Sequence, residues 1–144
     1  MSKRMAIRAA LVICVLFYAG TVFGQGKVQD YFNDAAIKVK ATNDPAQKRE
    51  ILSAKIQVMS TALDRVRNSS FVSESDRAGI DRTRAALQEK QDELAGTNGF
   101  TRVPDAQLNA FSDYVVQDME QADRTITIGL VTALLIVIII ILVA

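Results

Sequence analysis

The chain has 144 residues and a nearly balanced charge, with 17 basic and 16 acidic side chains, no histidine and a single cysteine. A lone cysteine excludes a disulfide scaffold, and the absence of imidazoles and of a second thiol excludes the usual zinc sites. The balanced charge and the few aromatic residues, 6% of the chain, argue against a nucleic-acid-binding protein.

Residues 1–24 have the pattern of a secretory signal peptide. The first eight carry three basic side chains and no acidic one (Lys3, Arg4 and Arg8), residues 9–23 are largely apolar, and the small Gly24 precedes the polar Gln25. This order is typical of a signal that is removed, here after Gly24; the alternative is an uncleaved N-terminal transmembrane helix. Cleavage would leave 14 basic residues against 16 acidic ones and remove the cysteine, Cys14.

Residues 25–125 are predicted to form one all-α domain, a small antiparallel helical bundle on the extracytoplasmic side. The segment is rich in residues that favour helices and has no alternating pattern typical of strands. Apolar side chains at spacings of three and four predict a first helix over 28–41 (Val28, Tyr31, Phe32, Ala35 and Val39). Asp44 as a cap and Pro45 in the first turn predict the start of a second helix over 45–67.

The second predicted helix carries the most regular apolar pattern of the domain. Five residues alternate steps of four and three along it: Leu52, Ile56, Met59, Leu63 and Val66. Such spacing is typical of a coiled-coil seam. We therefore predict that these residues form a helix-association seam, used either within the bundle or against a second chain.

Ser73 is the predicted cap of a third helix over 74–95, and the Gly-rich stretch from Gly96 is predicted to end it. Its apolar face is thin, and every lysine of the domain is expected on a polar face. A fourth helix is predicted from 103–105 onward. Residues 27–67 hold eight basic and five acidic side chains, whereas 105–123 hold five acidic and no basic ones, so the second and fourth helices are expected to complement each other in charge.

Residues 126–144 are uncharged and almost wholly apolar. As a helix they would measure about 28 Å, close to the roughly 30 Å hydrocarbon core of a bilayer. We predict a C-terminal transmembrane helix that continues the last bundle helix as one rod. The alternatives are a removable signal for a glycolipid anchor and an apolar segment buried in an assembly. Gly129 and Ala133 have the spacing of a transmembrane packing site.

Signatures of catalysis are absent from the sequence. The mature chain would lack the usual general base and thiol nucleophile, and it has neither a nucleophile-elbow serine nor a Gly-rich phosphate loop. We expect no enzyme, cofactor or metal. The predicted function is a membrane-anchored extracytoplasmic interaction or structural protein that contacts membrane lipid and acts through protein partners or self-association. The alternatives are a small helical ligand-binding sensor or receptor domain, and a structural membrane protein of a lipid-containing assembly.

Overall fold

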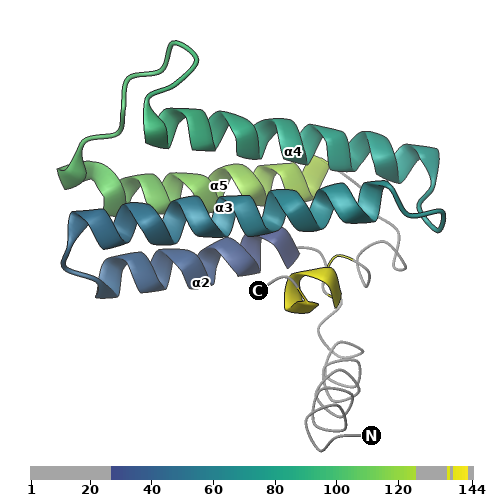
Figure 1. The fold of residues 1–144 in the computed structure, drawn as a ribbon, viewed down its shortest axis with the longest axis horizontal. Coiled ribbons are helices and arrows are strands. Elements are labelled where there is room, and N and C mark those ends of the chain that lie inside the picture. The colour runs from purple at the N-terminus through teal and green to yellow at the C-terminus, as the bar shows by residue number, and fades with distance from the viewer. Residues whose placement is uncertain (1–26, 126–135, 137, 143–144) are drawn as a thin grey trace, which may run out of the picture.

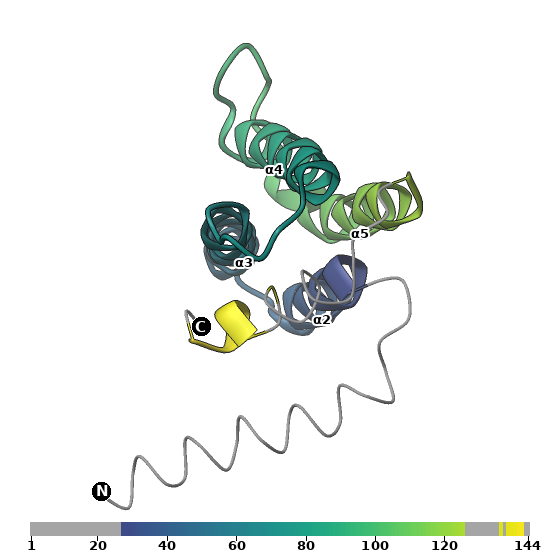
Figure 2. The same cartoon turned by 90° about the vertical axis from the view of Figure 1, so that its right-hand side faces the viewer.

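The computed structural model describes residues 27–125, 136 and 138–142, and every regular element among them is helical. The bundle consists of α2 (Lys27–Ala41), α3 (Pro45–Arg67), α4 (Glu74–Ala95) and α5 (Leu108–Thr125), with a 3-10 turn η1 (Asp105–Gln107) before α5. Successive helices run antiparallel (Figure 1), and the view along them shows α2 to α5 arranged around one centre (Figure 2). The predicted all-α antiparallel bundle is confirmed.

α3 and α4 begin and end where local chemistry predicts, whereas α5 begins at Leu108, later than the predicted start at 103–105, because a 3-10 turn precedes it. Asp44 accepts a hydrogen bond from the backbone N–H of Ala46 at 3.0 Å, and Ser73 accepts one from Asp76 at 3.2 Å. Both satisfy N–H groups that have no partner within their helix. At the end of α4, Gly96 adopts a φ of 74°, a left-handed conformation that favours glycine.

The core of the bundle contains the predicted seam of the second helix. Leu52, Ile56, Met59, Leu63 and Val66 are each at most 2% exposed, so all five pack within the single chain. They are joined in one apolar cluster by residues of the other helices, among them Phe32 and Val39 of α2, Ile80, Leu87 and Leu94 of α4, and Leu108, Val115 and Met119 of α5.

The antiparallel arrangement gives the bundle two ends of different content (Figure 1). The terminal end contains the start of α2, the turn 68–73 between α3 and α4, and the end of α5. The distal end contains the turn 42–44 between α2 and α3 and the loop 96–104 between α4 and η1. The chain therefore enters and leaves the bundle at the same end.

The described part of the C-terminal run lies against the bundle. Ile136 is 3% exposed and belongs to the apolar core, and Ile139 and Ile140 pack partly against that core. Figures 1 and 2 place this short helix beside α2 and α3 and not on the line of α5. These residues differ from the predicted continuous rod, because their apolar side chains find burial on the side of the bundle.

The remaining membrane predictions fall largely on other parts of the chain. The predicted signal peptide 1–24 and most of the predicted transmembrane helix 126–144, including Gly129 and Ala133, lie outside the described residues. Within the residues that the structure describes, no helix combines the length and the hydropathy that a membrane crossing requires.

Candidate functional site

The loop 96–104 at the distal end is organised by one carboxylate, that of Asp92 on the last turn of α4. Asp92 accepts hydrogen bonds from Thr97 at 2.9 Å, Asn98 at 3.0 Å and Gln88 at 3.1 Å. These bonds, led by that of Asn98, hold the pKa of the Asp92 carboxyl below its usual range. The carboxylate therefore fixes how the chain leaves α4.

Arg49 of α3 attaches the far side of this loop to the bundle. Its guanidinium donates to the backbone carbonyls of Leu94 at 2.9 Å and Val103 at 2.6 Å, and to the carboxylate of Asp105 at 2.8 Å. The bond from Arg49 keeps the pKa of Asp105 below its usual value. A cation that binds the last carbonyls of a helix also interacts favourably with the helix dipole. Arg49 thus connects α3, α4 and η1.

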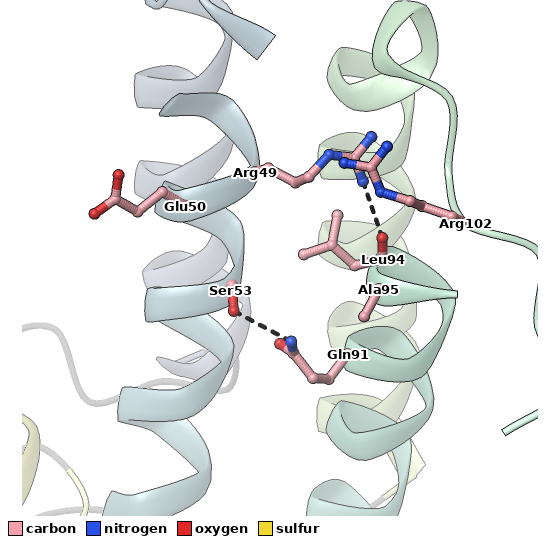
Figure 3. Close-up of a pocket in the computed structure, with 7 residues that line it drawn as sticks. All are labelled: Arg49, Glu50, Ser53, Gln91, Leu94, Ala95 and Arg102. Atoms are coloured by element: carbon pink, nitrogen blue, oxygen red, sulfur yellow. Dashed lines mark hydrogen bonds between the residues drawn. The ribbon is translucent and has the colours of Figure 1, made fainter. Parts of the chain in front are cut away.

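A cavity of about 250 Å³ opens beside this network. It is lined from α3 by Arg49, Glu50 and Ser53, from α4 by Gln91, Leu94 and Ala95, and from the loop by Arg102. In Figure 3, Gln91 reaches across to Ser53, and Glu50 points away from the other labelled side chains. The bond from the Gln91 amide to the Ser53 hydroxyl measures 3.1 Å.

The polar groups of the cavity are suited to binding an anion. Arg102 forms no hydrogen bond or ion pair within the described part of the chain, although its charge helps to lower the pKa of Asp105. Arg49 is only 14% exposed, and its buried Nε atom has no hydrogen-bond partner among the described residues. Both terminal nitrogens of Arg49 already donate to groups of the chain. The guanidinium of Arg102 has the geometry to pair with a carboxylate or a phosphate. The lining contains no group placed as a nucleophile beside a base.

The second polar cluster is built around Lys90, which is 1% exposed. Its ammonium lies 2.6 Å from Glu93 and 2.8 Å from Asp118, donates to the Tyr114 hydroxyl at 2.9 Å, and lies 4.0 Å from the centre of the Tyr114 ring. The expectation that every lysine lies on a polar face is wrong here. Ile80, Leu87 and Leu94 are spaced seven apart, and position 90 lies three residues after Leu87 and four before Leu94. This spacing was the signal that could have revealed the burial of Lys90.

The structure places one of the two predicted groups of site residues. The seam of α3 lies in the core and away from solvent, whereas Gly129 and Ala133 lie outside the described residues. Sequence reasoning missed Arg49 and Arg102 as cavity residues, because the residues that line the cavity come from α3 and from positions 91–102, which lie far apart in the chain. Among the described residues, no group of three or more acidic, histidine or cysteine side chains is placed to hold a metal ion. Comparison with protein-family models, curated protein sequences and solved structures finds no match.

Proposed function

We propose that the chain is a membrane-anchored extracytoplasmic interaction protein, whose helical domain is held to a bilayer by residues 126–144 and presents its distal end to protein partners. One observation carries the proposal: α2 begins and α5 ends at the same end of the bundle (Figure 1). Both apolar terminal segments can therefore enter one membrane. α3, with 23 residues, is about 35 Å long, and it separates that membrane from the arginine-lined cavity.

The apolar tail, residues 126–144, can bury its side chains in two places. One is the side of the bundle, and the other is the hydrocarbon of a bilayer. The bundle covers only one side of the described tail and leaves Ile141 43% and Leu142 69% exposed. A bilayer surrounds such a helix completely, and burying each large aliphatic side chain contributes about 1.5–3 kcal/mol. This difference favours the bilayer as the destination of the run 126–144.

The charge pattern next to the tail supports the extracytoplasmic side. The segment 105–123 holds five acidic and no basic residues, and Arg124 is the one basic residue between it and the apolar run, whereas the cytoplasmic flanks of membrane helices are usually basic. The signal-like segment 1–24 favours the same side.

The anchor is tested by washing membranes that contain the full chain with alkaline carbonate. We expect the wild-type chain to remain in the membrane pellet. Arginine at both Leu135 and Ile138 should move it to the supernatant, since each arginine near the centre of a span costs about 2.5–3.5 kcal/mol on insertion scales. A control with arginine at the exposed positions Gln57 and Gln117 should stay in the pellet. Release of the wild-type chain would contradict the proposal.

The proposed mode of action needs a partner or a second copy. Because the seam of α3 is buried inside the monomer, contacts between chains must use other surfaces. Chemical cross-linking of the detergent-solubilised chain is expected to capture a dimer or a specific partner. A strict monomer without a retained partner would oppose the interaction role and leave the anchor intact.

The cavity favours a second candidate function, that of a ligand-binding sensor or receptor domain for a small anion. Here we expect inorganic phosphate to raise the melting temperature of the solubilised full chain above its value in chloride of equal ionic strength. A ligand present at about 100 times its dissociation constant stabilises by roughly 2.7 kcal/mol. The variant Arg102→Gln should lose this increase, and Arg82→Gln, at an exposed position of α4, should keep it. Equal increases in all three proteins would indicate a general salt effect.

A further inference from the structure

The turn 68–73 between α3 and α4 has hydrogen bonds within its backbone and exposes a phenylalanine. The N–H groups of Ser69 and Val72 donate to the carbonyls of Val66 at 3.0 Å and Ser69 at 3.4 Å. The N–H of Phe71 donates to the Ser69 hydroxyl at 3.3 Å. Val72 is 5% exposed and packs in the core, whereas Phe71 is 76% exposed. The turn therefore presents the Phe71 ring outward from a fixed backbone.

This turn lies at the terminal end and projects from it. It connects the end of α3 to the start of α4, at the end of the bundle where the described part of α2 begins and that of α5 ends. Figure 1 shows the α3–α4 turn reaching past the first turn of α2 and the last turn of α5.

The turn contains no charged residue; its sequence is Asn-Ser-Ser-Phe-Val-Ser. Entry of an uncharged segment into the headgroup region of a bilayer avoids the large cost of desolvating ions. Aromatic and large aliphatic side chains that face a membrane bury themselves at the boundary of headgroups and acyl chains. The exposed ring, the uncharged turn and its place at the end where α2 begins and α5 ends all fit contact with a membrane surface.

We propose that Phe71 inserts into the lipid interface of the membrane that holds the chain, as a contact separate from the terminal segments. The inference rests on the proposed membrane anchor. The Phe71 contact orients the domain, because a second contact in addition to the anchor restricts the tilt of the domain on the membrane surface. The distal cavity is then directed away from the bilayer.

The chain contains no tryptophan, so each single tryptophan variant reports on one position. We compare Phe71→Trp with Phe100→Trp, which lies in the distal loop and is 41% exposed in the wild type. Both full-length variants are reconstituted in phosphatidylcholine vesicles with or without bromine on the acyl chains. Circular dichroism checks that both keep the helical fold.

The expected result is a blue-shifted emission and an about twofold loss of emission in brominated lipid for Phe71→Trp, since interfacial side chains lie about 5–10 Å into the boundary. Phe100→Trp should emit equally in the two lipids. If the chain resists carbonate but both variants emit equally in the two lipids, the Phe71 contact is overturned and the anchor stands. A blue shift at position 71 without quenching would place protein over the ring and also overturn the lipid contact. Release of the chain by carbonate overturns the anchor and the contact together.

Discussion

Replacing Lys90 by methionine should lower the free energy of unfolding by about 2–3 kcal/mol, somewhat less than the roughly 3–5 kcal/mol that breaking a fully buried ion pair costs. Methionine keeps most of the side-chain volume but leaves the carboxylates of Glu93 and Asp118 without their cation. The side chains of these two acids are 19% and 32% exposed, so water compensates part of the loss. Urea denaturation of the solubilised full chain, followed by circular dichroism at neutral pH, measures the difference.

The difference in the free energy of unfolding between the wild type and Lys90→Met should also depend on pH, which provides a second measurement. Burial lowers the pKa of Lys90, but its bonds to Asp118, Glu93 and Tyr114 raise it more, so that the pKa lies above the ordinary value of 10.5. A cation with a raised pKa contributes its full stabilisation below that ordinary value and loses it as the pH rises further. The gap between wild type and variant should therefore stay constant from neutral pH to about pH 10 and then narrow.

The control for Lys90 is Lys40, whose ion pair with Asp113 also connects α5 to another helix. The side chains of Lys40 and Asp113 are 47% and 49% exposed, and exposed pairs contribute about 0–1 kcal/mol. Lys40→Met should therefore cost less than about 1 kcal/mol. Equal losses in the two variants would show that burial does not distinguish the pairs.

The second large effect is expected from Gly96→Ala, at about 2–4 kcal/mol. Gly96 has a φ of +74°, and an added Cβ would lie 2.7 Å from the Cβ and 2.8 Å from the backbone nitrogen of Arg102. The left-handed conformation strains alanine, and the close approach forces the backbone of the distal loop to move. The variant should lower the melting temperature of the full chain and should also weaken any phosphate response that depends on Arg102.

Gly99 in the same loop separates conformational strain from crowding. It also has a positive φ, +87°, but an added Cβ would meet no atom within 4 Å. Gly99→Ala should therefore cost about 1–2 kcal/mol from backbone strain alone and leave the phosphate response unchanged. If the two variants were equally destabilised, the contact between Gly96 and Arg102 would not be a packing constraint.

The helices could be predicted because their signals are local. Asp44, Ser73 and Gly96 act within one turn of chain, and the seam of α3 follows from spacing along one helix. The apolar face of α4 is thin in the sequence because two of its buried positions hold polar residues. Thr83 and Lys90 complete its periodic row and are 3% and 1% exposed, because partners on other residues satisfy their polar atoms. Periodicity without regard to polarity would have placed both in the core.

The sequence alone determined the all-α class, the bounds of α3 and α4, the spacing of the α3 seam and the two apolar terminal segments, because these depend on neighbours within a few residues. Only the tertiary structure decided that Lys90 is buried, that Arg49 joins the carbonyls of Leu94 and Val103 to Asp105, and that Arg102 completes a cavity. These groups come from positions 24 to 56 residues apart in the chain. Hydrogen bonds and ion pairs act over a few ångströms, so such partners are defined only once the helices have packed.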